Sequence, residues 1–216
     1  MDVVLLAIFY ALFSLGGSLV ASTYGNASPL WPASGLGIWW LARHGWRNWP
    51  GLLVGALAAR SLQSEPILVT LSIGVGNVLE AVAGAWLLLL VRTRLTGTGF
   101  QLLLPAKTAV AAVAAPCLSA TIGTVTLVWS GIIPAMAWVQ VGFTWWIGDV
   151  IGIFLLFPFL EALSSFAAER RTTPLLHSLQ LWSTIGMALA GGLVTWLVRN
   201  PRTSVGTERL YLGDRS

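Results

Sequence analysis

The chain has 216 residues, of which 56% are hydrophobic and only 9% are charged. Soluble domains carry about 25% charged residues, and the mean hydropathy here is +0.79. Composition therefore excludes an ordinary soluble protein and indicates a polytopic membrane protein. The net charge of +4 comes from basic residues scattered through short loops, which argues against nucleic acid as a partner. A single cysteine excludes an internal disulfide and a cysteine-based metal cluster.

Apolar segments recur along the chain with the length of a membrane span, about 20 residues. The first is expected at Val3–Ala21, which lacks the basic region and cleavage site of a removable signal peptide. Longer ones follow at 66–91, 108–128, 135–160 and 179–198. Pro116 is expected to kink the segment 108–128, in which Ser119 is one of several hydroxyl residues, and Pro158 with Glu161 is expected to close the segment 135–160. With two shorter segments between, the sequence predicts an all-α, polytopic transmembrane helical bundle of about seven spans. The polar tail at 203–216 is expected to be unstructured.

The two short segments come early in the chain. The segment 30–42 is too short to cross a bilayer alone, and Pro32, Gly35 and Gly37 predict that it is broken or partly unwound. Non-helical backbone at membrane depth is tolerated where it is buried or lines a cavity, so this segment is a candidate wall of a site. The other short segment, 52–59, follows a basic, aromatic loop at 43–51.

An acid in the middle of an apolar run marks the first candidate site. Asp149 lies well inside the run 135–160, flanked by Gly148 and Gly152. An intramembrane carboxylate is costly unless it faces the bundle interior and finds a partner. Small residues four apart let a neighbouring helix come close enough to supply that partner. The stretch predicts a packed polar seam.

A second intramembrane acid, Glu80, lies in the run 66–91. Asn77 precedes it by three residues and Gly76 by four, so all three share one helix face. This face is expected to be closely packed. The two acids are expected either to hold helices together, with Arg60, Lys107 or backbone groups as further partners, or to line a ligand site.

Aromatic residues give weaker signals. Most of the 12 tryptophans are expected to be interfacial anchors, whereas Trp31 and Trp146 are candidates for the pocket. The histidines His44 and His177 lie in loops, and no nucleophile, paired-acid or metal motif accompanies the two acids. The sequence therefore predicts no catalytic residue, no metal and no cofactor.

The distribution of Lys and Arg predicts the orientation, because basic loops stay in the cytoplasm. With a cytoplasmic amino terminus, the outer loops before the last segment hold only Arg60. The inner loops then hold Arg43, Arg47, Arg92, Arg94, Lys107, Arg170 and Arg171. A seventh span would place the basic residues after 198 outside. We therefore expect that an eighth span is missing or that one short segment does not cross.

Four groups of residues, in this order, resemble the MASE1 domain, a bacterial integral membrane sensory module. They are Trp31, Pro32 and Gly35; Gly45, Arg47, Trp49, Pro50, Gly51 and Gly55; Gly76, Asn77, Glu80 and Ala81; and Trp145, Trp146, Gly148, Asp149, Gly152 and Pro158. The resemblance implies a MASE1-like domain over 1–202, commonly of eight spans, in the bacterial cytoplasmic (inner) membrane.

The resemblance also implies a role in signal transduction. Such modules precede histidine kinase (two-component) or cyclic-di-GMP output domains (GGDEF or EAL), so an output partner is expected in cis or in trans, together with the lipid bilayer and a possible homodimer. The chain itself is not expected to be an enzyme. The alternative is a small-molecule or ion transporter, or its substrate-binding membrane subunit, since short helices and buried acids are also transporter features.

Overall fold

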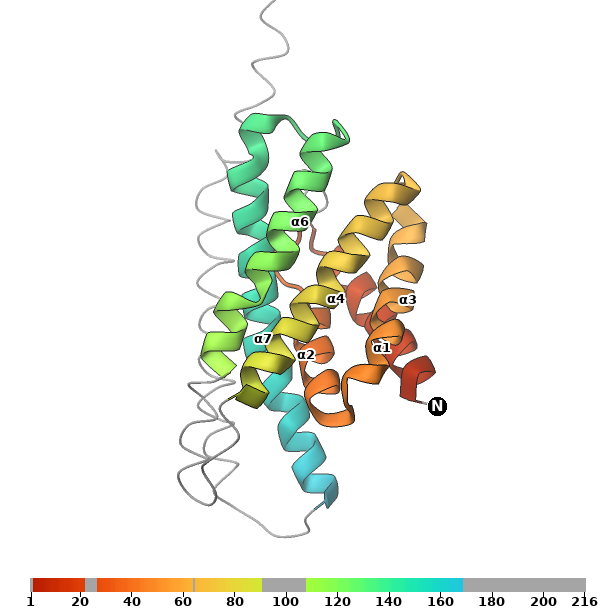
Figure 1. Cartoon of the computed structure of the whole chain (residues 1–216), viewed down its shortest axis with the longest axis vertical. Coiled ribbons are helices and arrows are strands. Elements are labelled where there is room, and N and C mark those ends of the chain that lie inside the picture. The colour runs from red at the N-terminus through yellow and green to blue at the C-terminus, as the bar shows by residue number, and fades with distance from the viewer. Residues whose placement is uncertain (1, 22–26, 64, 91–107, 169–216) are drawn as a thin grey trace, which may run out of the picture.

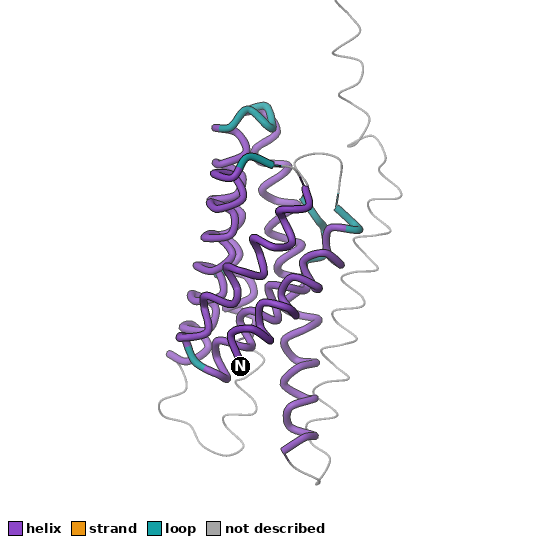
Figure 2. The backbone as a smooth tube through the Cα atoms, turned by 90° about the vertical axis from the view of Figure 1, so that its right-hand side faces the viewer, coloured by secondary structure: helices purple, strands orange, loops and turns teal. Residues whose placement is uncertain are grey.

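A computed structural model describes residues 2–21, 27–63, 65–90 and 108–168. The elements in this part of the chain are all helical (Figure 2), which confirms the predicted all-α class. They are α1 (Asp2–Ser18), α2 (Pro32–His44), η1 (Trp46–Asn48), α3 (Trp49–Arg60), η2 (Ser61–Gln63), α4 (Ile67–Leu90), α6 (Pro116–Trp129), η4 (Ala135–Ala137) and α7 (Trp138–Ala168).

Three helical stretches are long and apolar enough to cross a membrane. They are Ile67–Leu90, Thr108–Trp129 and Ala135–Ser164. At about 1.5 Å per residue, the 24 residues of the first reach about 36 Å, more than the hydrocarbon core of a bilayer. Helices α1, α2 and α3 have 17, 13 and 12 residues. The predicted last segment, 179–198, lies outside the described residues.

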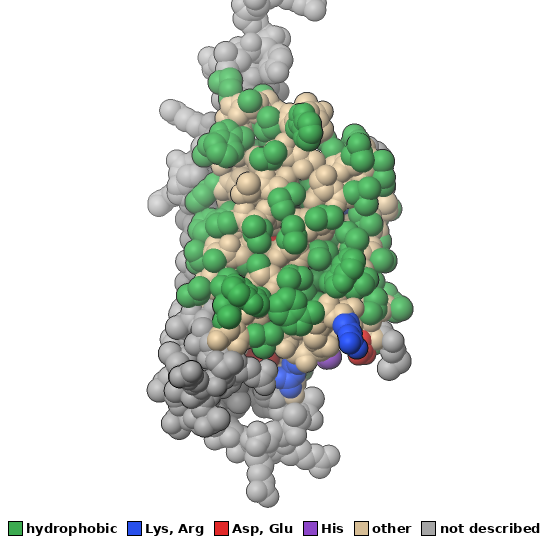
Figure 3. Space-filling view, viewed as in Figure 1, with side chains coloured by type: hydrophobic (Ala, Val, Ile, Leu, Met, Phe, Trp, Pro, Cys, Tyr) green, Lys and Arg blue, Asp and Glu red, His purple; other side chains and the backbone are tan. Residues whose placement is uncertain are grey.

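The helices form a bundle along one long axis. Successive helices α3, α4, α6 and α7 run in opposite directions (Figure 1). Helix α2 is the central one, since it packs against α1, α4 and α7 and buries most of its 13 residues. Large hydrophobic side chains cover the visible outer face, and the basic side chains seen there gather at the lower end (Figure 3). This surface is that of a multi-pass membrane protein.

Helix α2 corrects the expectation of a helix broken at its glycines. It is continuous through Gly35 and Gly37. These glycines serve close packing instead, because a Cβ on Gly35 would lie 2.6 Å from the carbonyl oxygen of Gly152 in α7. The non-helical part comes earlier, at Trp31 (φ −126°, ψ 80°). Its N–H donates to the carbonyl oxygen of Gly148 at 3.0 Å.

Two prolines behave differently. The helical stretch 108–129 is interrupted by a turn at Ala115, immediately before Pro116, as expected from the missing N–H and the ring clash of an internal proline. Pro158 was expected to close its span together with Glu161, but α7 continues through it to Ala168. Apolar packing stabilises α7 on both sides of Pro158, since Phe157 belongs to the same buried cluster as α2 and Leu160 packs against that cluster.

Candidate functional site

Asp149 lies inside the bundle, and helices on either side supply its partners. Its residue is only 1% exposed. Ser34 Oγ, from α2, donates to Oδ1 at 2.9 Å, and Ser119 Oγ, from α6, donates to Oδ2 at 2.9 Å. Asp149 therefore links α7 to both of its neighbours through charge-assisted hydrogen bonds, the stronger kind.

Glu80 reaches the same place from α4 and is also 1% exposed. Its carboxylate faces Asp149, Ser34 and Ser119. Neither of its oxygens reaches hydrogen-bond geometry with a described residue. A buried carboxylate without a donor is expensive, so Glu80 is the member of the cluster that still needs a partner. We call Ser34, Glu80, Ser119 and Asp149 the polar core.

A second set of side chains borders the polar core. The Tyr10 phenol of α1 lies beside Trp31 and Asn77, and all three residues are buried. The indole N–H of Trp31 has no hydrogen-bond partner among the described residues. The structure thus brings together the predicted residues Trp31, Asn77, Glu80 and Asp149, and the side chains around them come from five helices, α1, α2, α4, α6 and α7, and from the extended stretch before α2.

Glycines allow the segments to meet so closely. A Cβ on Gly148 would collide with the carbonyl of Ser28, and one on Gly152 with the carbonyl of Trp31. The extended stretch before α2 therefore lies directly on the backbone of α7. Gly76 has a milder role, since a Cβ there would lie 3.3 Å from Ile122 of α6. The predicted small-residue faces are where the polar core is assembled.

No basic side chain among the described residues reaches the polar core. Arg60 was expected as a partner of the acids, and this is wrong, because it forms a buried ion pair with Glu65 next to its own helix end. Arg43 pairs with Glu161 at 3.3 Å. Lys107, the other expected partner, lies outside the described residues. The described residues also contain no group of three or more potential metal ligands.

Comparison with known proteins settles the family. The sequence profile of MASE1 matches residues 1–200. The chain belongs to the MASE1 family. MASE1 domains are membrane sensory modules associated with signalling output domains. No curated protein and no solved structure matches the chain significantly.

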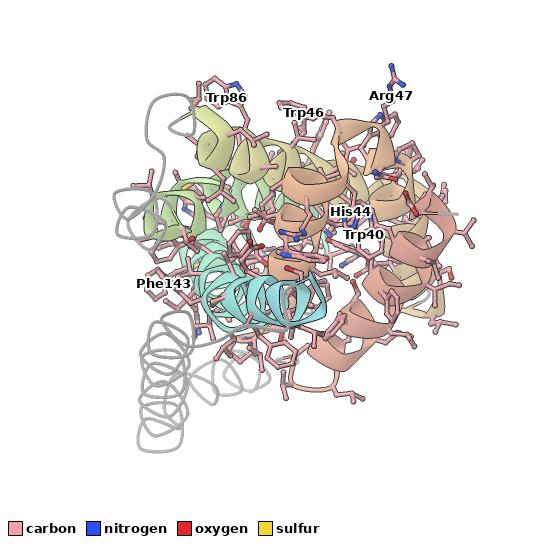
Figure 4. All side chains as sticks on the ribbon, turned by 90° about the horizontal axis from the view of Figure 1, so that it is seen from below. Trp40, His44, Trp46, Arg47, Trp86 and Phe143 are labelled. Carbon is pink, nitrogen blue, oxygen red and sulfur yellow. The ribbon has the colours of Figure 1, made fainter. Side chains whose placement is uncertain are left out.

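The MASE1 residues divide between two places in the structure. One place is the polar core, which contains Glu80 and Asp149. The start of α2, with Trp31, Pro32 and Gly35, lies beside it. Arg47, Trp49 and Pro50 lie instead at the lower end of the bundle, in η1 and the first turn of α3. Arg47 extends away from the bundle (Figure 4), so the MASE1 loop motif does not contribute to the polar core.

Trp146 also lies outside the polar core of this MASE1 chain. Its Nε1 donates to the carbonyl oxygen of Val113 at 2.9 Å, which ties α7 to the first turns of the helical stretch before Pro116. Its ring lines a cavity of about 310 Å³ between α6 and α7, together with Phe143 and Cys117. This cavity is almost entirely apolar, which suits a hydrocarbon surrounding better than a polar ligand.

Sequence reasoning did not single out Ser34 or Tyr10, and it named Ser119 only as one of several hydroxyls. Hydroxyl residues are common in membrane helices, where they satisfy their own backbone carbonyls, as Thr126 does with Ile122. The available signal was position. Ser34 lies between Pro32 and Gly35, and Ser119 lies three residues after Pro116.

Proposed function

We propose that this chain is a membrane-embedded sensory input module in which the polar core is the sensing element and a cytoplasmic output, a histidine kinase or a cyclic-di-GMP enzyme, is the regulated partner. One observation carries the proposal. Helices α2, α4, α6 and α7 each contribute one side chain to a single buried cluster. A structural glue between two helices would not need four.

The physical link between site and signal is packing. A ligand that prefers one arrangement of the four helices over another shifts the population toward it, by as much as its two affinities differ. The ends of α4 and α7 lie at the lower end of the bundle, the end that holds Arg43 and Arg47 (Figure 1). A change at the polar core would thus reach the side that the basic residues assign to the cytoplasm.

Topology is testable directly. We expect about seven spans with the amino terminus inside. A reporter active only in the cytoplasm should work when fused after Arg171, and one active only outside should work when fused after Ser216. The reason is the distribution of Lys and Arg, which places the loop holding Arg170 and Arg171 in the cytoplasm. An inside location for Ser216 would show that one short helix does not cross, and an outside location for Arg171 would contradict the orientation.

The sensing role predicts altered output in polar-core variants. The chain is fused after Arg171 and after Ser216 to a diguanylate cyclase reporter, and cyclic di-GMP is measured in cells. Ser34→Ala and Ser119→Ala should each change the level about threefold or more, because an interhelical hydrogen bond in a membrane is worth about 0.6–1.7 kcal/mol.

The control is Ser130→Ala, which removes an exposed hydroxyl bonded only to its own helix. It should leave output unchanged. Unchanged output in both polar-core variants, at normal membrane levels and in whichever fusion is active, would contradict the sensing role. Solute uptake into vesicles that Asp149→Asn abolishes would instead favour the transporter alternative.

A further inference from the structure

Among the described residues, two carboxylates and no basic side chain reach the polar core. Of the described basic side chains, Arg43 and Arg60 have acidic partners elsewhere, and His44 and Arg47 lie at the lower end. The groups facing the two acids are Tyr10 from α1, Ser34 from α2 and Ser119 from α6. None of these carries a positive charge. Two ionised carboxylates here would be desolvated and would repel each other, so binding of one positive charge would be favourable.

The ligands available favour a proton over a metal cation. The described residues offer no set of three acidic, histidine or cysteine ligands for a metal. A proton adds no volume, and acid pairs that share a site hold one between them.

The hydrogen bonds at Ser119 depend on where that proton is. A serine hydroxyl has one proton to donate, but Ser119 Oγ has two acceptors, Asp149 Oδ2 at 2.9 Å and the Pro116 carbonyl oxygen at 3.1 Å. When Asp149 is ionised, Ser119 donates to it. When Oδ2 carries a proton, Asp149 donates to Ser119 Oγ, and the Ser119 proton turns to Pro116.

Pro116 is where this exchange can change the shape of the bundle. It directly follows the turn at Ala115 that interrupts the helical stretch 108–129. The proline removes one backbone hydrogen bond there, so an extra donor to its carbonyl acts on a turn that already lacks one such bond. We propose that Glu80 and Asp149 bind one exchangeable proton and that Ser119 transmits its presence to the interrupted turn at Pro116. This inference rests on the sensing site proposed above and names its ligand.

The chain supplies its own reporter for the test. Cys117 is the single cysteine, it is exposed, and it follows Pro116 directly. The purified full chain is labelled there with an environment-sensitive fluorophore and titrated from mildly acidic to mildly alkaline pH. We expect a one-proton fluorescence step, lost in both Asp149→Asn and Glu80→Gln, and a matching infrared carboxyl band at the acidic side that Asp149→Asn also lacks.

Ser119→Ala separates transmission from binding. It should keep the carboxyl band and lose the fluorescence step. The control carries Cys117→Ala and Ser130→Cys, which moves the label to the far end of α6, and should show no step. Absence of the carboxyl band in the unchanged chain would overturn proton binding, and a midpoint that moves with sodium or potassium would replace the proton by a metal cation.

The outcomes also separate this inference from the sensing role. A titration step without any effect of the polar-core variants on cyclic di-GMP would leave the proton site standing and remove its role in signalling. Altered output without a carboxyl band would keep the sensing role and exclude the proton. Size-exclusion chromatography of each labelled variant identifies misfolding. A purely structural role of the two acids is preferred only if both Glu80→Gln and Asp149→Asn misfold.

Discussion

Gly152→Leu is expected to prevent the bundle from assembling. A Cβ at this position meets the carbonyl of Trp31, which is backbone and cannot move aside as a side chain can. Separating α7 from the start of α2 would also break the Trp31 to Gly148 hydrogen bond and the one between Ser34 and Asp149. Overpacking of this kind costs about 3 kcal/mol or more.

The measurement is the thermal stability and membrane yield of the purified variant. Gly16→Leu is the matched control, because a Cβ added at that exposed helical glycine meets nothing within 4 Å. It should behave like the unchanged chain. Equal stability of the two variants would show that residues 28–31 do not lie against α7 as described.

Arg60→Leu is expected to destabilise the fold by about 3–5 kcal/mol, the cost of leaving one partner of a buried ion pair alone. The side chains of Arg60 and Glu65 are only 5% and 9% exposed. Leu in place of Arg60 would leave the Glu65 carboxylate without its cation at the turn between α3 and α4. Thermal unfolding of the purified chain measures the loss.

The double variant Arg60→Leu with Glu65→Leu tests the cause. Replacing both charges by apolar side chains removes the desolvation cost together with the attraction, so most of the stability should return. A double variant as unstable as Arg60→Leu would mean that Arg60 acts through its packing and not through its charge.

The sequence predicted the polar core only in part, and the reason lies in how membrane helices use polar residues. Asp149 and Glu80 could be recognised because a carboxylate within an apolar run has no ordinary explanation there. Ser34 and Ser119 could not, because a hydroxyl in a helix can satisfy itself on the preceding turn. Only the packing of α2 and α6 on α7 turns these two toward Asp149.

Helix boundaries were likewise predicted where local chemistry decides them and missed where packing does. Pro116 interrupts its helix as expected, whereas Pro158 does not end α7. The local rule for proline is the same at both positions, and packing of α7 on α2 decides the difference. Gly35 and Gly37 were interpreted as helix breakers because the conformational freedom of glycine is known from the residue type alone. Their actual use, close approach of other helices, depends on neighbours that the sequence does not place.

The start of α2 within the bundle has an electrostatic consequence. A helix carries a partial positive charge, about half an elementary charge, at its amino-terminal end because its first N–H groups are unpaired. In α2 this end begins at Pro32, two residues before the serine that bonds Asp149. The helix dipole is thus directed at the acids and offsets part of their charge. The first turn of α2 thus supplies Asp149 with a hydroxyl donor and with part of a positive charge at the same time.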